Sequence, residues 1–164
     1  MASSPHKVSE PYSTRGASRA VRLASHDYAS ATPLHVIICT CDQEQVLTGS
    51  LAKRVSQSIE KTSELLGYEL YAYCVMPDHV HVLLSPARSE APLREWLRKF
   101  KSFTTRQYQC TAGKARLWQR SAFDRVLRTN EPVNKVAGYI ACNPERKGLV
   151  ECWTEWPYSK VFVA

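Results

Sequence analysis

Residues 68–84 read Tyr68-Glu69-Leu70-Tyr71-Ala72-Tyr73-Cys74-Val75-Met76-Pro77-Asp78-His79-Val80-His81-Val82-Leu83-Leu84. The first nine are rich in aromatic and apolar residues, a composition typical of a β-strand. Pro77-Asp78 is turn chemistry, and an apolar run resumes directly after it. Two strands joined by so short a turn predict an antiparallel β-hairpin at the centre of the chain.

The segments on either side of this hairpin complete an α+β pattern. Periodicity predicts a strand over 34–41, a helix over 51–66, a helix over 93–108, partly extended chain over 117–128 and a helix over 131–143. Gly67 and Gly113 stop the first two helices, and Pro144 is expected to end the third. This order of elements predicts a ferredoxin-like antiparallel sheet with helices packed on one face.

The chain has 164 residues, which is the usual size of one domain. Residues 1–32 are rich in Ser, Ala and Arg and predict a poorly ordered basic leader, followed by a single domain over 33–164. No window approaches the roughly 18 apolar residues that a membrane helix needs, and the start lacks a secretory pattern. We therefore expect a cytoplasmic protein with reduced cysteines and no membrane contact.

Positive charge is concentrated in one segment. Between Arg88 and Arg128, eleven basic residues stand against three acidic ones, a net charge of +8, whereas the whole chain carries +7. Aromatic residues are interleaved with them, so cations are available for phosphates and rings for stacked bases. This pattern favours a nucleic-acid partner. The alternative is a solvated basic helix whose aromatic residues form its buried face.

His79 and His81 are the sharpest local signal for chemistry. Side chains at positions i and i+2 of a strand point to the same face, so both imidazoles project together while Val80 and Val82 enter the opposite layer. Two such imidazoles can chelate one divalent ion. Histidines on a solvated strand face without a metal are the alternative.

Tyr139 and Asn143 are a second pair, four residues apart on the last predicted helix and therefore on one helical face. A tyrosine hydroxyl can attack a phosphodiester when a metal ion stabilises the developing charge, and a carboxamide oxygen can bind that ion. In the competing interpretation, Tyr139 is a core aromatic residue and Asn143 caps the helix before Pro144.

Longer motifs around these residues resemble those of a known family. Residues 76–84 are similar to the M-P-N/D-H-x-H-x-L-L signature of the HUH single-tyrosine transposases, and residues 138–150 to their Y-I-x-x-N-P-x-R-x-G-L-V segment. Residues 117–126 resemble the L-W-Q…F…R-V stretch of the REP-associated branch, and residues 36–40 resemble its first strand. The four matches occur in the order found in that family.

This resemblance implies a metal-dependent DNA transposase. His79 and His81 would bind Mg²⁺ or Mn²⁺ with Asn143 as the third protein ligand, and Tyr139 would cut single-stranded DNA to leave a 5′-phosphotyrosine and a free 3′-OH. The partner would be single-stranded or hairpin DNA. The protein would act at the bacterial nucleoid, as a monomer or a homodimer. The expected phosphate contacts are Arg94, Arg98, Lys99, Lys101, Arg106, Arg120 and Arg125.

Two other functions stay open on the sequence. A domesticated, non-catalytic descendant would only bind repetitive hairpin DNA. A metal-dependent phosphodiesterase with water as its nucleophile would cleave DNA without forming a covalent adduct.

Overall fold

The computed structural model describes residues 32–86, 90–113 and 116–163, which form a five-stranded antiparallel sheet with helices on it. The strands, in the spatial order β4-β1-β3-β2-β5, are β1 (Leu34–Cys39), β2 (Glu69–Val75), β3 (His79–Ser85), β4 (Phe123–Val126) and β5 (Ser159–Val161). The predicted hairpin is β2 and β3, and the first four strands follow the ferredoxin-like β-α-β-β-α-β order. The expected α+β antiparallel fold is confirmed. Of the predicted leader, only Thr32 lies within the described residues.

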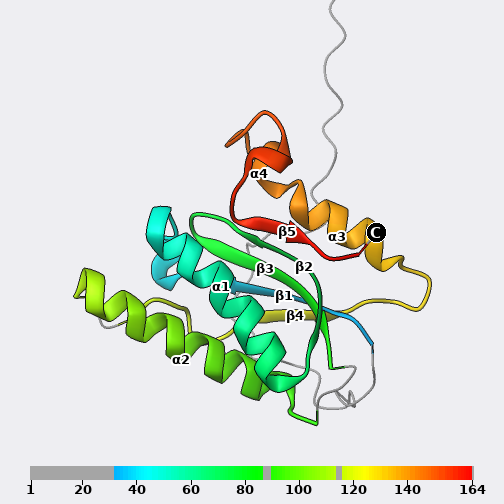
Figure 1. Cartoon of the computed structure of the whole chain (residues 1–164), viewed down its shortest axis with the longest axis horizontal. Coiled ribbons are helices and arrows are strands. Elements are labelled where there is room, and N and C mark those ends of the chain that lie inside the picture. The colour runs from blue at the N-terminus through cyan, green and yellow to red at the C-terminus, as the bar shows by residue number, and fades with distance from the viewer. Residues whose placement is uncertain (1–31, 87–89, 114–115, 164) are drawn as a thin grey trace, which may run out of the picture.

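Two long helices, α1 (Gly49–Leu66) and α2 (Leu93–Ala112), lie together on one face of the sheet (Figure 1). Their buried side chains share a core with Val80 and Val82 of β3. Each helix ends at a glycine in the left-handed region, Gly67 at φ 69° and Gly113 at φ 66°, where a side chain would be strained. Both stops are where the sequence predicted them.

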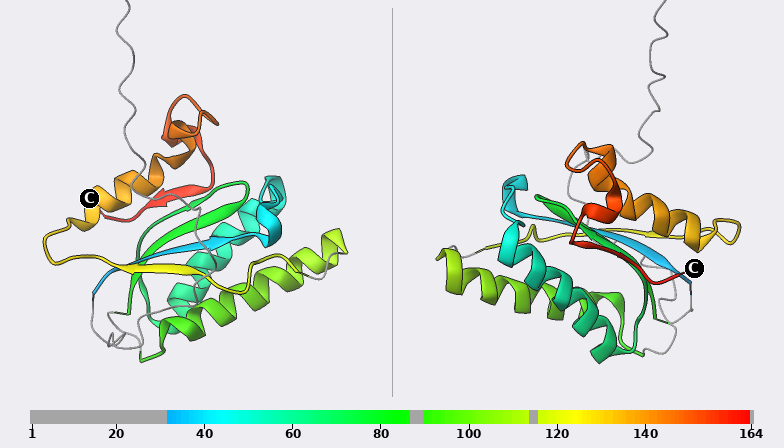
Figure 2. Two further views of the ribbon diagram at one scale, coloured as in Figure 1. Left: turned by 180° about the vertical axis from the view of Figure 1, so that it is seen from behind. Right: turned by 45° about the horizontal axis from the view of Figure 1, so that its top comes forward.

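A third helix, α3 (Val133–Ala141), lies on the opposite face, so that the sheet is sandwiched between α3 and the α1–α2 pair (Figure 2). Its Ile140 is buried in a second core with Leu83 and Cys74. The expectation that all helices share one face therefore holds for α1 and α2 and not for α3. The physical reason is that the central strands β2 and β3 carry apolar side chains on both faces, and each face has to be covered.

The last predicted helix is in fact two helices. α3 ends at Ala141, and a short α4 (Asn143–Arg146) follows, with Pro144 in its first turn. Pro144 begins a helix here instead of ending one, because its fixed φ suits the first turn and its missing N–H leaves no bond unmade there. Asn143 consequently stands at the junction of the two helices.

The C-terminal segment adds a strand that the sequence did not predict. β5 pairs with β2, and the Trp156 indole donates a hydrogen bond to the Val75 carbonyl at 2.9 Å. Short 3-10 turns occupy Cys41–Gln43 and Trp153–Glu155. A strand of only three residues has no alternation long enough to recognise.

Two further expectations concern the whole chain. All six cysteines are free thiols. Across the described ranges, the structure has no helix with the length and apolar character needed to cross a bilayer.

A candidate metal and tyrosine site on the α3 face of the sheet

His79 and His81 lie next to each other on the α3 face of β3, as strand alternation predicted. Their Nε2 atoms are 3.0 Å apart, with the two rings at 83°. Two unprotonated nitrogens repel each other at this distance, so a shared proton or a cation has to lie between them. Two ligands at right angles, each about 2.1 Å from an octahedral cation, are about 3.0 Å apart. The pair therefore fits such a cation.

Asp78 orients the first of these imidazoles. Its Oδ1 lies 2.5 Å from Nδ1 of His79, so that the carboxylate holds the Nδ1 proton and leaves Nε2 facing His81. This hydrogen bond lowers the pKa of Asp78, whereas burial of the carboxylate acts to raise that pKa. The same carboxylate also interacts with the backbone N–H of Asp78, so this turn residue contacts both its own backbone and the histidine.

His35 is a residue that the sequence analysis missed. It is 1% exposed on β1, its Nε2 lies 3.1 Å from Nδ1 of His81, and the two rings stack with centroids 5.3 Å apart. Burial lowers the pKa of His35 to about 4, the charge of Arg125 acts in the same direction, and Glu131 opposes them. Burial, followed by the charges of His79 and His35, also lowers the pKa of His81. The signal in the sequence that could have identified His35 is its position as the one histidine in the otherwise apolar stretch Leu34–Cys39.

The α3–α4 unit carries the other two candidates. Tyr139 is half-buried against the core between α3 and the sheet, and Cζ of Arg146 lies 4.4 Å from the centre of its ring. Asn143 is buried, and its Nδ2 donates hydrogen bonds to the carbonyls of Tyr139 at 3.2 Å and Ile140 at 3.0 Å. Asn143 thus has the capping role that the competing interpretation gave it. These two bonds use its amide nitrogen and leave its carboxamide oxygen available to a ligand.

The end of this helical unit lies near the β2–β3 turn. The main cause of the lowered pKa of Asp78 is its bond to His79, and the positive charge of Lys147, directly after α4, is a smaller one. Within the described part of the chain, no group of three His, Cys, Asp or Glu side chains is arranged to hold a metal. A third protein ligand beside the histidine pair would therefore have to be a side chain of another type.

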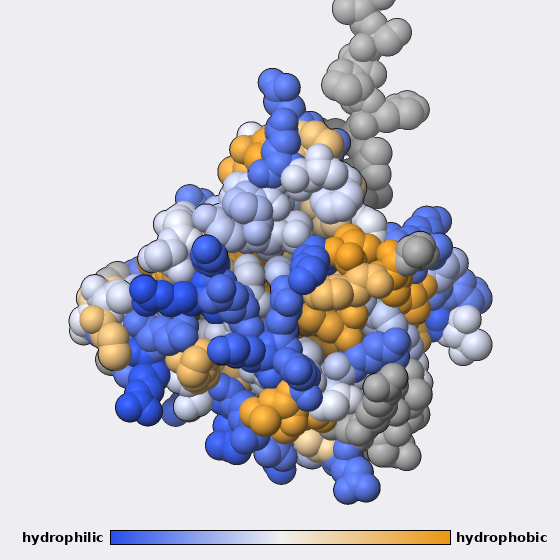
Figure 3. All heavy atoms as spheres, in the orientation of Figure 1, coloured by the Kyte–Doolittle hydropathy of each residue, from blue (hydrophilic) through white to orange (hydrophobic). Residues whose placement is uncertain are grey.

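The basic helix α2 lies on one face of the sheet (Figure 2) and shares a core with Val80 and Val82. Because side chains alternate along β3, His79 and His81 are on the opposite face. Among the predicted phosphate contacts of α2, Arg94, Arg98 and Arg106 are exposed and Lys99 is half-buried. The surface around α1 and α2 is mostly hydrophilic (Figure 3). These four side chains are placed where a ligand could reach them.

Two of the predicted phosphate contacts bind inside the protein instead. Nζ of Lys101 donates to the carbonyls of Gln119, Arg120 and Ser121 at 2.8, 3.2 and 3.0 Å, and burial lowers its pKa to about 8. Arg125 makes a two-pronged ion pair with Glu131 at 2.7 and 2.9 Å. Because these cations hold loops in place, we do not retain them as phosphate contacts.

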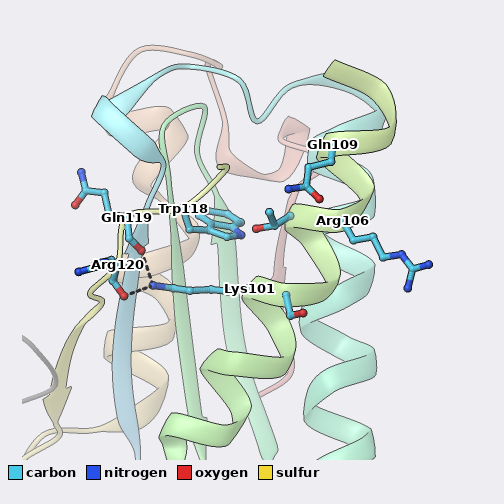
Figure 4. Close-up of a pocket in the computed structure, with 8 residues that line it drawn as sticks. Lys101, Arg106, Gln109, Trp118, Gln119 and Arg120 are labelled. Carbon is cyan, nitrogen blue, oxygen red and sulfur yellow. Dashed lines mark hydrogen bonds between the residues drawn. The ribbon is translucent and has the colours of Figure 1, made fainter. Parts of the chain in front are cut away.

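A hollow of about 620 Å³ lies between α2 and the segment before β4 (Figure 4). It is lined by Lys101, Ser102, Thr105, Arg106, Gln109, Trp118, Gln119 and Arg120. The backbone N–H of Gln119 bonds to the carbonyl of Cys39, which is the pairing partner of His79 in the sheet. The hollow therefore lies at the end of the sheet that carries His79.

The antiparallel α+β sheet carries the histidine pair and the tyrosine-bearing helix on the same face, and the motifs around these residues resemble those of the single-tyrosine transposases. The family model described as "Transposase IS200 like" matches residues 28–143. This match covers more than half of the chain, and the protein belongs to the IS200-like transposase family.

Individual relatives are more distant. A protein of Haemophilus influenzae provisionally named a REP-associated tyrosine transposase is 28% identical over 110 residues, which cover 61% of this chain and 62% of that protein. The REP-associated tyrosine transposase of Escherichia coli K12 is 24% identical over 92 residues, or 56% and 53% of the two chains. The chain thus spans little more than half the length of these curated relatives.

A solved structure of a REP-associated tyrosine transposase bound to a REP hairpin shares the fold. It matches with a TM-score of 0.63 at 21% identity, over 79% of this chain and 76% of that one.

Proposed function

We propose that this protein is a transposase that cuts and rejoins single-stranded DNA beside a hairpin, through Tyr139 and with Mg²⁺ or Mn²⁺ held by His79 and His81. The observation that carries the proposal is the pair of opposed Nε2 atoms 3.0 Å apart, with both Nδ1 atoms already bonded to Asp78 and His35. Membership of the IS200-like family supports the same activity.

The chain offers three ligands to the ion: Nε2 of His79, Nε2 of His81 and the carboxamide oxygen of Asn143. The carboxamide oxygen suits both Mn²⁺ and Mg²⁺, the two imidazole nitrogens make Mn²⁺ the better match of the two ions, and three protein ligands leave positions for water and phosphate. When bound, the ion would polarise a phosphate oxygen and stabilise the charge that develops during attack.

Tyr139 is the proposed nucleophile. The phenol gives up its proton as its oxygen forms a bond to phosphorus, the bond from phosphorus to the 3′-oxygen breaks, and that oxygen takes up a proton and leaves as a 3′-hydroxyl. The 5′ side of the cut stays on Tyr139 as a phosphodiester, which keeps the bond energy needed for rejoining by another 3′-hydroxyl. Arg146 on the face of the ring supports the orientation of the phenol.

The two faces of the sheet suggest the form of the DNA. Exposed cations at Arg94, Arg98 and Arg106 of α2, with Lys99 and Arg120, are proposed to bind phosphates on one face, whereas the histidines lie on the other. A DNA substrate that reaches both the cations of the α2 face and the histidines has to pass around the end of the sheet, where the hollow beside Gln119 lies. A hairpin on the α2 face with a flexible single strand leading to His79 meets this requirement, and a straight duplex does not.

The test compares the wild type with Tyr139→Phe and His81→Ala, using labelled hairpin DNA taken from repeats that flank the gene and Mn²⁺ or Mg²⁺. Denaturing gels should show a protein–DNA adduct that needs both the metal and Tyr139. Cleavage that survives Tyr139→Phe would point to water as nucleophile. Tight binding without cleavage under any metal would identify a non-catalytic DNA-binding descendant.

A further inference from the structure

We propose that His35 is a positioning residue for the metal ligand His81: by accepting the Nδ1 proton of His81, it keeps Nε2 of His81 free for the cation. The inference rests on the proposed metal-binding role of the His79–His81 pair. His35 lies 46 residues away from His81 in the chain, and its contact with His81 is made only in the folded protein.

The geometry leaves His81 one useful ligand atom. Its Nε2 faces Nε2 of His79 at 3.0 Å, and its Nδ1 faces Nε2 of His35 at 3.1 Å. A neutral imidazole carries its proton on one nitrogen only, so Nε2 can bind a cation only when the proton is on Nδ1. His81 is 6% exposed, which leaves the neighbouring side chain as the group that decides between the two tautomers.

The direction of the hydrogen bond then follows. If His35 donated through its own Nε2–H, His81 would accept at Nδ1 and its proton would stand on Nε2, between the two proposed ligands. If His35 accepts at Nε2, His81 presents an unprotonated Nε2 toward His79, and without a cation the proton shared by the pair stands on Nε2 of His79, whose Nδ1 faces the carboxylate of Asp78. Only the second arrangement permits a cation at the pair, and it places the single proton of His35 on its Nδ1.

The choice of histidine for this position has a physical reason. The partly exposed His79 is oriented by a carboxylate, Asp78, which remains in contact with solvent. A carboxylate at the 1% exposed position of His35 would be desolvated at high cost, whereas a neutral imidazole is not. The charged neighbour of His35 across the sheet, Arg125, is already neutralised by Glu131.

Metal-free protein labelled with ¹⁵N tests which nitrogen of His81 carries the proton. Long-range proton–nitrogen correlation spectra at pH 7.5 report which nitrogen of each histidine carries the proton. The proposal expects the Nδ1–H tautomer for His81 in the wild type and in His35→Gln, whose side-chain oxygen can still accept. In His35→Leu the acceptor is gone, and the Nε2–H form should gain population. A wild-type His81 in the Nε2–H form overturns the inference, whatever the variants do.

Titration of the same proteins with Mn²⁺ tests the consequence. Loss of a partner that orients a ligand histidine typically costs about 10–100-fold in metal affinity. The Mn²⁺ affinity of His35→Leu should therefore be lower than that of the wild type by this factor, and the affinity of His35→Gln should be reduced much less. Ile37→Val, on the same strand and the same face, is the control and should bind as the wild type does, with amide spectra confirming that every variant is folded.

The failures of the two proposals are distinguishable. A wild type that holds His81 in the Nδ1–H form and binds no Mn²⁺ contradicts the metal site while leaving the tautomer assignment intact. His35→Leu with wild-type affinity and an unchanged tautomer assigns His35 to packing alone.

Discussion

The guanidinium carbon of Arg146 lies 4.4 Å from the centre of the Tyr139 ring, so that α4 holds the aromatic side chain of α3 from its face. A cation at such a position is worth about 0.5–1 kcal/mol at an exposed site. Arg146→Ala should therefore slow adduct formation roughly 2–5-fold in a single-turnover assay while leaving the melting temperature nearly unchanged, because Arg146 is exposed. An unchanged rate would show that the contact does not orient the phenol.

The ion pair of Arg125 with Glu131 predicts an acid-sensitive contribution to stability. The hydrogen bond from Arg125 lowers the pKa of Glu131, with burial opposing it. A carboxylate whose folded pKa is lowered stabilises the protein above its unfolded pKa of about 4.3, and this contribution is lost as the pH falls through the folded value.

Glu131→Gln should accordingly lower the free energy of unfolding by about 1–2 kcal/mol at pH 7. Urea unfolding at pH 7, 5, 4 and 3 should show the difference from the wild type shrinking below about pH 4. Glu95→Gln, which removes the partner of Arg98 in an exposed pair at 3.9 Å, serves as the control and should change stability little at any pH. A constant difference across the pH range would mean that packing, and not charge, is what Glu131 contributes.

Asn143 allows its capping role and its proposed ligand role to be separated. Asn143→Asp loses both hydrogen bonds to the carbonyls of Tyr139 and Ile140, which should cost about 1–3 kcal/mol of stability. Its carboxylate should nevertheless bind Mn²⁺ as well as or better than the amide oxygen does. Asn143→Leu should lose both stability and affinity. Equal Mn²⁺ affinity in the wild type and both variants would remove Asn143 from the ligand set.

The exposed arginines of the hollow predict a change in the salt dependence of DNA binding. Each phosphate contact in a single strand contributes about 0.7 to the slope of log affinity against log salt concentration. Arg106→Ala and Arg120→Ala should each reduce the slope by about this amount, measured by fluorescence anisotropy with hairpin DNA carrying a single-stranded flank. Lys53→Ala, an exposed cation of α1, should leave it unchanged. Equal reductions of the slope in all three variants would indicate that the DNA is attracted by the overall positive charge of the protein and does not contact the hollow specifically.

Much of the candidate site was predictable because it depends on local rules. Strand alternation placed His79 and His81 on one face and Val80 and Val82 on the other, and the structure has them there. The end of α3 was less predictable, because the same Pro144 that can end one helix can begin another.

The sequence by itself determined the α+β order of elements, the central hairpin, the helix stops at Gly67 and Gly113 and the shared face of the two histidines, because each depends on neighbours within a few residues. Only the tertiary structure decided which face α3 covers, that His35 bonds to His81, and that Lys101 and Arg125 bind the protein's own carbonyl and carboxylate groups. Whether a cation or an imidazole is free for a ligand depends on partners that the chain brings together only when it folds, and no local pattern records them.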